Sequence, residues 1–367
     1  MKLLHVLWQG AVGGAEKAVY QLAHKQSQQP GWEVHIAYGQ AEGVYVHLAK
    51  ETGIIIVDLR LKSAHDWLSI GQLRKQLSGY DLHHFHVAEP LILLASVLTS
   101  GVRRVYTYRA GAHPRSWKQT FRYFLAGRIL RWRFHGISAN TTHAAHVAEK
   151  MWHLSPGTVK TTYNGLNFDL LRPTLNHQTA RANMGIVDEE EWVIGTVANL
   201  KPVKRIERLI QAVAGLKGRW KLVIVGEGPL RQNLEMLAQT LGIRNQIKFV
   251  GSQTQVADWL IGMDVFVLPS HEESFGNAAV EAMALGLPTI VFSDGGGVKE
   301  HLIHGQTGWI VEDVAGLRTC LEELYQDRRK AQTIAQAGQT YVHTMYTVDR
   351  MVETYNQFYS AIGLNIC

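Results

Sequence analysis

Two glutamates in the second half of the chain flank a segment that could bind a phosphate and a sugar. Glu273 lies in a polar loop after the apolar run 265–268, and Glu281 lies in the helix that follows. The amides at the start of this helix, with the positive end of its dipole, would bind an anion; they belong to Phe275, Gly276 and Asn277. Carboxylates suit sugar hydroxyls, because each oxygen accepts a directional hydrogen bond. A helix cap beside solvated acids would explain the same residues, so spacing alone leaves both interpretations open.

Short apolar runs rich in branched residues recur along both halves of the chain, each followed by a turn and a helix-period stretch. This rhythm is typical of parallel α/β units. In the first half, strands are predicted at 3–7, 34–38, 54–59, 83–86, 105–108 and 136–138. In the second half, they are predicted at 192–197, 221–225, 247–250, 265–268, 289–292 and 308–311. The fold class is therefore α/β, with two doubly wound parallel-sheet domains and a linker within 164–191.

The length and composition exclude several classes of protein. The chain has 367 residues, 46% hydrophobic and 19% charged, with 34 Gly, 9 Pro and 2 Cys, which excludes a disordered or fibrous chain. Cys320 and Cys367 form neither a disulfide framework nor a zinc-ligand cluster, so a reducing cytoplasm is expected. The longest apolar run, 91–97, is far shorter than the ~20 residues of a membrane-spanning helix. We therefore do not expect the chain to be an integral membrane protein.

The segment from Glu273 to Pro288 resembles the signature of the family-four glycosyltransferases of the GT-B fold, the group 1 type. The signature is Glu, seven residues and Glu, followed by Ala-Met-Ala, Gly and Pro, and the chain carries each of these residues. Further motifs match the family in the expected order, so the resemblance extends over nearly the whole chain. They are Gly13-Gly14-Ala15-Glu16, the strand end 81–86 with His84 and His86, Asn164-Gly165-Leu166-Asn167, 197–204, 225–229 and 296–300.

This resemblance implies a GT-B architecture, in which two Rossmann-like domains face a central cleft. Residues 1–172 would form the acceptor-binding domain, and a C-terminal helix at about 346–367 would pack back on it. Residues 173–345 would bind the nucleotide sugar, linked to UDP or GDP. The implied enzyme is a retaining hexosyltransferase that transfers a sugar to a cell-envelope polysaccharide, a lipopolysaccharide or a lipid-linked acceptor. A GT-B phosphorylase or sugar-nucleotide epimerase is an alternative.

The resemblance also assigns roles to single residues. Lys204 and the amides of the helix start would stabilise the departing diphosphate. Such stabilisation of developing charge is usually the largest contribution to the rate of transfer. Glu273 would orient the donor sugar, and Glu281 the ribose. The remaining residues that would contact the nucleotide sugar are Gly13, Gly14, Asn199, Gly226, Gly228, Ser274, Phe275, Gly276 and Asn277. No Asp-x-Asp pair occurs in the sequence, so neither a metal ion nor another cofactor is expected.

Two positions depart from the family pattern. Ala198-Asn199-Leu200 stands in place of the usual Gly-Arg-Leu, so Asn199 replaces a phosphate-binding arginine. Arg109 follows a predicted strand at the point where many relatives carry a histidine near the transferred sugar. A guanidinium cannot act as a base at ordinary pH, but as a member of the catalytic set it could contact a phosphate or an acidic acceptor. The departures leave open a catalytically weakened protein that binds a sugar nucleotide or a membrane.

The net charge of +6 is concentrated in one stretch of the chain. Between Glu89 and Glu149 there is no acidic residue, and the rest of the chain carries more acids than bases. The cations of this stretch are Arg103, Arg104, Arg109, Arg115, Lys118, Arg122, Arg128, Arg131 and Arg133. On a predicted helix, several of them adjoin an apolar arc of Trp117, Phe121, Phe124, Leu125 and Trp132.

Basic residues beside an aromatic stripe suit an anionic bilayer surface. The segment 103–133 therefore predicts a cytoplasmic protein that is peripheral on the inner face of the cytoplasmic membrane. A helix that packs its aromatics on the sheet, with a solvated basic edge, is the alternative. Nucleic acid is not expected, because no recognised binding module accompanies the cations. His83, His84 and His86 alternate along one strand, so satisfied strand-end histidines are favoured over a metal site.

Overall fold

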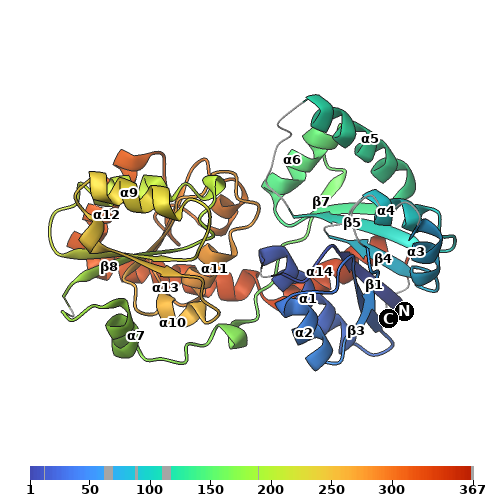
Figure 1. The fold of residues 1–367 in the computed structure, drawn as a ribbon, viewed down its shortest axis with the longest axis horizontal. Helices are drawn as coiled ribbons and strands as arrows, with labels where there is room; N and C mark the ends of the chain where they lie inside the picture. The colour runs from blue at the N-terminus through green and yellow to red at the C-terminus, as the bar shows by residue number, and fades with distance from the viewer. Residues whose placement is uncertain (12, 62–68, 87–89, 110–116, 189, 365–367) are drawn as a thin grey trace. The chain divides into compact units, whose positions relative to one another are not determined.

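The computed structural model describes residues 1–11, 13–61, 69–86, 90–109, 117–188 and 190–364, without the side chains of 117–122 (Figure 1). By its internal contacts the chain divides into two units. Unit 1 comprises Met1–Leu166 and Tyr346–Cys367, and unit 2 comprises Asn167–Met345.

Unit 1 contains a seven-stranded parallel sheet with the order β3-β2-β1-β4-β5-β6-β7. Its strands are β1 (Lys2–Leu7), β2 (Glu33–Tyr38), β3 (Ile55–Asp58), β4 (Leu82–Phe85), β5 (Arg103–Tyr108), β6 (Gly136–Ala139) and β7 (Val159–Thr161). The order reverses between β1 and β4, and open α/β sheets bind ligands beyond the carboxyl ends of the strands at such a point. His86 and Arg109 directly follow β4 and β5 at this edge.

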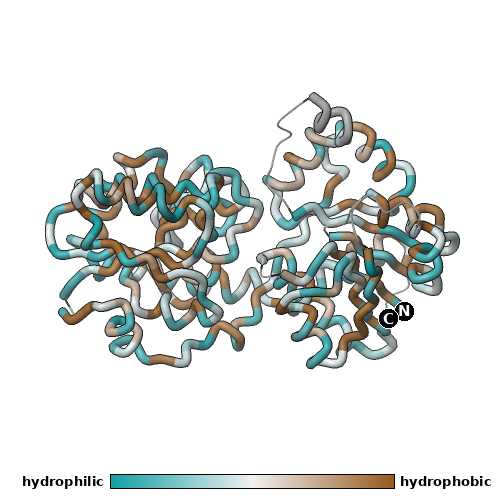
Figure 2. The backbone as a smooth tube through the Cα atoms, in the orientation of Figure 1, coloured by the Kyte–Doolittle hydropathy of each residue, from teal (hydrophilic) through white to brown (hydrophobic). Residues whose placement is uncertain are grey.

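Helices cover both faces of this sheet, because successive strand residues point to opposite faces. They are α1 (Gly14–Ser27), α2 (Val44–Glu51), α3 (Ile70–Gln76), α4 (Pro90–Val97), α5 (Trp117–Arg133), α6 (Thr142–Trp152) and α14 (Val348–Ala361). One core cluster joins Leu3 and Leu7 to α1 and α14, and another joins Leu4 and Val6 to α4 and α6. Brown, hydrophobic stretches of backbone lie inside both units in Figure 2.

Unit 2 contains a six-stranded parallel sheet with the order β10-β9-β8-β11-β12-β13. Its strands are β8 (Trp192–Val197), β9 (Trp220–Val225), β10 (Ile247–Gly251), β11 (Val265–Leu268), β12 (Thr289–Phe292) and β13 (Trp309–Val311). Its helices are α7 (His177–Met184), α8 (Ile206–Val213), α9 (Arg231–Thr240), α10 (Val256–Leu260), α11 (Asn277–Ala284), α12 (Val314–Gln326) and α13 (Arg328–Met345). Short 3-10 turns are η2 (Phe168–Leu171), η3 (Pro202–Lys204), η4 (Arg244–Gln246) and η5 (Gly297–His301). The order reverses between β8 and β11, so the loops after these strands meet at one edge.

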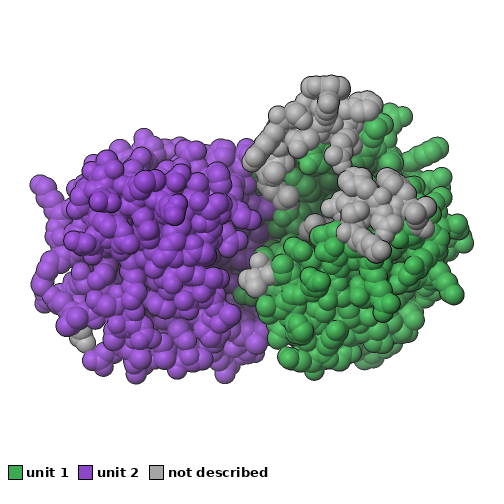
Figure 3. All heavy atoms as spheres, viewed as in Figure 1, with its two compact units in different colours: residues 1–166, 346–367 green, residues 167–345 purple. Residues whose placement is uncertain are grey.

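The two parallel sheets confirm the predicted fold class. The sequence pattern missed β7, because this short edge strand buries only Val159 and so contains no apolar run. Sequence analysis placed the domain boundary after residue 172, whereas residues 167–172 belong to unit 2 (Figure 3). The ring of Phe168 stacks on His343 of α13, with centroids 4.1 Å apart, and this contact ties the segment to unit 2.

Candidate functional site

Lys204 and Glu273 form an ion pair at the carboxyl edge of the unit 2 sheet. Lys204 ends the η3 turn after β8, and Glu273 lies in the loop between β11 and α11. Their side chains are 21% and 18% exposed, so a ligand can reach them although they are largely shielded from bulk water. Charges at partly buried positions interact more strongly than charges in water. The structure therefore brings together two residues that the resemblance assigned to the catalytic set.

Backbone hydrogen bonds connect the loops after β8, β11 and β12 around this ion pair. The amide of His271 donates to the carbonyl of Val203 at 2.8 Å, and the amide of Glu273 donates to the carbonyl of Gly295 at 2.9 Å. Gly296 lies opposite Glu273 with a φ of 70°, and a Cβ at Gly296 would lie 2.7 Å from the Glu273 carbonyl oxygen. Glycine is required there, because other residues avoid a positive φ and the space is filled. The main chain thus sets the position of Glu273.

Sequence reasoning missed a second ion pair that supports the same loops. Arg208 of α8 donates two hydrogen bonds to the carboxylate of Asp294, at 2.8 and 2.7 Å. These bonds hold the pKa of Asp294 below its usual range. Asp294 also pairs with His271 Nδ1 at 3.1 Å, and its carbonyl accepts a hydrogen bond from the Glu272 amide at 3.0 Å. No motif signals Arg208, because its contact with a residue 86 positions away arises only from the fold.

The start of α11 is shaped by Gly276 and by a buried histidine. Gly276 precedes the helix with a left-handed backbone of φ 79°, and a Cβ there would lie 2.6 Å from Val298 Cγ2. His301 pairs through Nε2 with the carbonyl oxygen of Phe275 at 2.7 Å, and burial lowers the pKa of His301 to about 4. The ring is therefore neutral at physiological pH and donates from Nε2. This hydrogen bond fixes the peptide that follows Phe275, and with it the direction of the Gly276 amide.

The remaining predicted residues of this segment lie on or beside the first turn of α11. Ser274 is 8% exposed, and Asn277 is the partly exposed first residue of the helix. Glu281 is 7% exposed and lies one helical turn after Asn277, so the two share a face. The residue assigned to the ribose is therefore buried rather than on the open surface.

The loops after β8 and β9 hold three further predicted residues close together. Two backbone hydrogen bonds of 3.0 Å join residues 198–200 to residues 225–227. A Cβ at Gly226 would lie 2.0 Å from a carbonyl oxygen of the first loop, and a Cβ at Gly228 would lie 2.6 Å from another. Both glycines are therefore explained by the close packing of the two loops. Asn199 is exposed at the edge that these loops form.

In unit 1, Gly13 and Gly14 lie where α1 begins, beyond the carboxyl end of β1. A Cβ at Gly13 would lie 2.2 Å from a carboxylate oxygen of Glu16. Burial raises the pKa of Glu16, whereas the nearby charge of Arg109 lowers it. The start of α1 and Arg109 thus belong to the same edge of the unit 1 sheet.

Arg109 is held by three side chains from separate segments of unit 1. Its Nε donates to His86 Nδ1 at 3.2 Å, and one terminal nitrogen donates to the hydroxyl of Tyr355 at 3.0 Å. The other terminal nitrogen donates to the side-chain oxygen of Asn164. The three partners come from the end of β4, from α14 and from the turn that the sequence analysis matched to the family. Sequence reasoning identified Arg109 and missed Tyr355.

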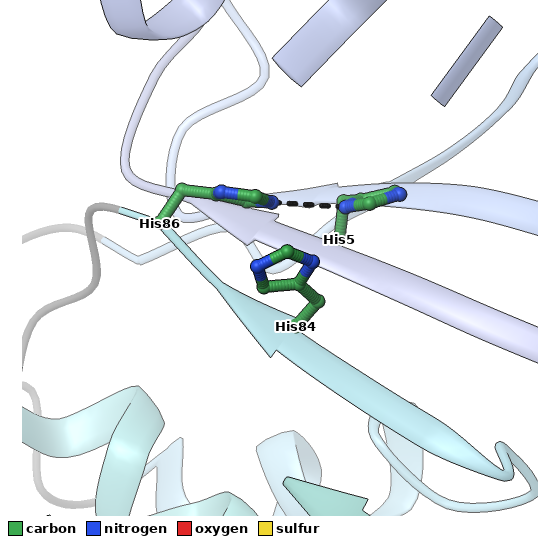
Figure 4. Close-up of side chains that lie close together, drawn as sticks. All are labelled: His5, His84 and His86. Carbon is green, nitrogen blue, oxygen red and sulfur yellow. Dashed lines mark hydrogen bonds between the residues drawn. The ribbon is translucent and has the colours of Figure 1, made fainter. Parts of the chain in front are cut away.

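Three buried histidines lie next to Arg109 on one face of neighbouring strands, His5 on β1 and His84 and His86 at the end of β4 (Figure 4). Ligand atoms of the three rings lie within 4.8 Å of one another, as they would around a metal ion. However, His5 Nδ1 already pairs with His86 Nε2 at 2.9 Å, and His84 pairs with two hydroxyl groups at 2.6 and 2.7 Å. The charge of Arg109 would also repel a cation. The cluster is better described as a hydrogen-bonded network.

A cavity of about 1020 Å³ lies between α4 and α5 in unit 1, and its lining is mostly apolar. Trp132 is 84% exposed beside it, and Ile129 is 49% exposed. The exposed residues Arg128, Arg131 and Arg133 contribute to the same lining. Among the helices of the described ranges, none has both the length and the apolar character to cross a membrane.

The predicted basic and aromatic arc lies partly outside the described residues. This holds for Arg115 and for the side chains of Trp117, Lys118, Phe121 and Arg122. Phe124, Leu125 and Trp132 are 37%, 45% and 84% exposed. These three side chains are therefore open to solvent at least in part, and Leu125 and Trp132 line the cavity together with Tyr106 of β5.

Two family descriptions match the sequence. Residues 12–170 match Glycosyltransferase Family 4, and residues 180–341 match Glycosyl transferases group 1. The chain is 30% identical over 177 residues to N-acetyl-alpha-D-glucosaminyl L-malate synthase of Bacillus anthracis, covering 47% of this chain and 46% of that protein. It is 31% identical over 250 residues to D-inositol 3-phosphate glycosyltransferase of Rhodococcus erythropolis, covering 62% of this chain and 54% of that protein. The chain spans about half the length of the curated relatives it matches.

Solved structures share the fold over the full length of the chain. HepE of Anabaena in complex with UDP and glucose superposes with a TM-score of 0.87 at 20% identity, covering 98% of this chain and 100% of that chain. WaaG, a glycosyltransferase involved in lipopolysaccharide biosynthesis, superposes with a TM-score of 0.72 at 16% identity, covering 97% of this chain and 99% of that chain. At these identities the likeness concerns the fold.

Proposed function

Because the chain belongs to the family-four, group 1 glycosyltransferases of the GT-B fold, we propose that it transfers a sugar from a nucleotide-linked donor. The donor is a UDP- or GDP-linked hexose, and the acceptor is a cell-envelope polysaccharide, a lipopolysaccharide or a lipid-linked glycan. The observation that carries this proposal is the ion pair of Lys204 and Glu273 beside the start of α11. We further propose that the transfer retains the anomeric configuration and requires no metal ion.

In the proposed mechanism, the bond between the anomeric carbon and the phosphate oxygen breaks through an oxocarbenium-like state. Negative charge then develops on the departing diphosphate, and Lys204 and the amides at the start of α11 stabilise it. Glu273 accepts hydrogen bonds from hydroxyls of the donor sugar. The acceptor hydroxyl attacks on the face that the diphosphate leaves, and its proton passes to a departing phosphate oxygen. Attack on that face preserves the anomeric configuration.

The names of the relatives support this choice of substrates. One relative is named as a synthase of N-acetyl-alpha-D-glucosaminyl L-malate and another as a D-inositol 3-phosphate glycosyltransferase, so both names contain an anionic compound, malate or inositol 3-phosphate. The Anabaena structures contain UDP, glucose or UDP-glucose. These findings favour a UDP-linked donor and an acceptor with a negative charge.

Incubation of the purified chain with radiolabelled nucleotide sugars and bacterial envelope acceptors tests the proposal. We expect release of the nucleoside diphosphate and transfer of label to the acceptor. A phosphorylase would instead produce a sugar 1-phosphate, and an epimerase would change the sugar while leaving the nucleotide attached. If no donor is turned over, the proposed activity is wrong.

A second candidate function is binding of a sugar nucleotide without turnover. Asn199 and Arg109 favour it, because they stand where the family has a phosphate-binding arginine and a histidine. A binding protein of this kind would gain thermal stability with a nucleotide sugar, since a ligand that binds only the folded state stabilises it. It would nevertheless release no nucleoside diphosphate.

Excess chelator is expected to leave the transfer rate unchanged. Lys204 and the amides at the start of α11 supply positive charge at the diphosphate, so a divalent cation is not needed for that role. Initial rates before and after treatment with EDTA, with Mg²⁺ or Mn²⁺ added back in a parallel sample, measure this. An absolute requirement for the added ion would refute metal independence.

We also propose that α5 brings the acceptor domain to an anionic membrane surface. The exposed Trp132 and Ile129 supply apolar contact, and the exposed Arg128, Arg131 and Arg133 supply positive charge on the same helix. This combination is typical of helices that lie in the plane of a membrane interface. A lipid-linked acceptor would be reached from that position.

Replacement of Arg131 and Arg133 by Gln is expected to weaken binding to anionic vesicles about 30-fold, since each cation near the lipid contributes ~1 kcal/mol. Sedimentation with vesicles of phosphatidylglycerol and phosphatidylcholine measures this, with pure phosphatidylcholine as the neutral membrane. Arg60→Gln removes an 80% exposed cation elsewhere in unit 1 and serves as the control. Equal binding to anionic and neutral vesicles would remove the electrostatic part of the proposal.

A further inference from the structure

A network of buried polar side chains surrounds Arg109 in unit 1, and the mechanism above does not use it. His5, His84 and Tyr355 are 0% exposed, and His86 is 1% exposed. Burial of polar groups costs free energy unless each group is hydrogen-bonded. Apolar packing does not explain why these polar side chains are buried at the carboxyl edge of the sheet. They are arranged around one cation, Arg109.

The hydrogen bonds of this network run in one direction, which Arg109 determines. A guanidinium only donates, so His86 Nδ1 accepts from Arg109 Nε and the neutral ring of His86 carries its proton on Nε2. That proton is donated to His5 Nδ1 at 2.9 Å. His5 in turn carries its proton on Nε2 and donates it to Gln26 Oε1 at 2.9 Å (Figure 4 shows the histidine pair).

Burial keeps His86 and His5, the two histidines joined by these hydrogen bonds, neutral. It lowers the pKa of His86 well below its usual value, with the neighbouring His84, Arg109 and His5 acting in the same direction. It lowers the pKa of His5 to about 3. Only a neutral His86 can accept the hydrogen bond from Arg109, because a protonated ring offers no lone pair. The network therefore orients the guanidinium over the whole physiological pH range.

Tyr355 and Asn164, the other two partners of Arg109, also hold the guanidinium in place. Tyr355 accepts from Arg109 at 3.0 Å and from Thr162 at 3.0 Å, so its hydroxyl is itself fixed. Asn164 is 3% exposed and accepts from the remaining nitrogen. Because all three nitrogens are anchored, little side-chain entropy remains to be lost when a ligand binds, and such preorganisation favours affinity.

These anchors orient Arg109 without cancelling its charge. His86, Asn164 and Tyr355 are neutral, and the three hydrogen bonds use three of the five N–H groups of a guanidinium. Beyond these bonds, each terminal nitrogen has one further N–H. Arg109 is partly exposed and stands at the carboxyl end of β5, where ligands of such sheets bind.

We propose that Arg109 binds an anionic group of the acceptor, a phosphate or a carboxylate, and that His86, His5, Asn164 and Tyr355 are its positioning residues. This inference rests on the proposed function, because the family assigns the acceptor to unit 1. Lys204 and the start of α11, which stabilise the donor diphosphate in the proposed mechanism, belong to unit 2. Phosphates and carboxylates share the paired oxygens that a guanidinium binds in bidentate fashion.

Thermal unfolding of the full chain in saturating UDP, with increasing inorganic phosphate or malonate, tests the proposal. UDP occupies the donor site, so a further rise in Tm reports a second anion site. We expect phosphate or malonate to raise the Tm, and neutral inositol to leave it unchanged. Arg109→Met should weaken the anion response at least about tenfold, as expected for loss of a charge-assisted hydrogen bond. Arg60→Gln, which removes an 80% exposed cation elsewhere in unit 1, is the matched control.

The positioning role predicts a difference between variants of the same buried site. His86→Gln keeps an acceptor oxygen for Arg109, whereas His86→Met does not. We expect His86→Met to weaken phosphate binding about tenfold and His86→Gln to restore most of it, even if both variants lower the Tm in the absence of anions. Tyr355→Phe removes one hydroxyl and keeps the ring, so it supplies a milder test should a His86 variant fail to fold.

The proposal is overturned if the wild-type chain shows no response to either anion, or if Arg109→Met responds like the wild type. An equal loss in Arg60→Gln would also overturn it, because general electrostatics would then explain the response. Stabilisation by UDP alone is a separate readout of the proposed donor site. If UDP does not bind, the same anion titrations of the Lys204→Ala variant, without UDP, still report on Arg109.

Discussion

Lys204→Ala is expected to lower kcat for sugar transfer by about 10²- to 10³-fold, the usual loss when one preorganised charge-stabilising group is removed. The ammonium group would meet a diphosphate whose negative charge grows as the glycosidic bond breaks. Its effect should therefore be larger in the transition state than in the bound donor, so kcat should fall more than KM rises. The side chain is 21% exposed, and its removal should leave the fold intact.

Initial rates with a radiolabelled nucleotide sugar, together with the Kd of UDP, measure this effect. Lys201→Ala is the matched control, because Lys201 is an exposed cation directly before the same η3 turn. We expect it to stay within a factor of about two of the wild type, as surface charges contribute little. An unchanged kcat in Lys204→Ala would end the assignment of Lys204 to the leaving group.

Acidification from pH 7 to pH 5 is expected to destabilise unit 1 by about 8 kcal/mol, or about 2 kcal/mol for each of His5, His83, His84 and His86. All four rings are buried, and burial lowers their pKa values, for His5 to about 3 and for His83 to about 4. The unfolded chain takes up protons below its ordinary histidine pKa of 6.5, whereas the folded chain does not. The contribution of these histidines to stability is therefore fully present above pH 6.5. It is lost as the pH falls toward their pKa values in the folded state. Glu16 opposes the trend, because burial raises its pKa.

Denaturant unfolding at pH 7, 6 and 5, resolved by hydrogen exchange for each unit, measures this loss. His86→Gln removes one of the four rings and should reduce the loss between pH 7 and pH 5 by about a quarter, or about 2 kcal/mol. His47→Gln, at an exposed position of α2 in the same unit, should leave it unchanged. If the stability of unit 1 is the same at pH 7 and pH 5, the histidines are not held neutral by burial.

The sequence by itself determined the position of nearly all the strands. Buried parallel strands consist of short runs of branched apolar residues, and glycine and polar turns mark where each run ends, so both signals are local. The exception, β7, lies at an edge and buries one residue, which leaves no such run to detect. Motifs such as Glu273 to Pro288 are local as well, and they predicted a donor-binding segment from the sequence alone.

Only the tertiary structure decided which of these residues act together. Lys204 and Glu273 meet across 69 positions of sequence, and Arg109 meets Tyr355 across 246. The sequence analysis assigned no functional role to His5. Its partners lie on or directly after β4, which becomes a neighbour of β1 only through the order of the sheet. Sheet order and register depend on the packing of the whole unit, whereas periodicity depends on a few successive residues. The chemistry of single residues is therefore visible in the sequence, and their partners become visible in the fold.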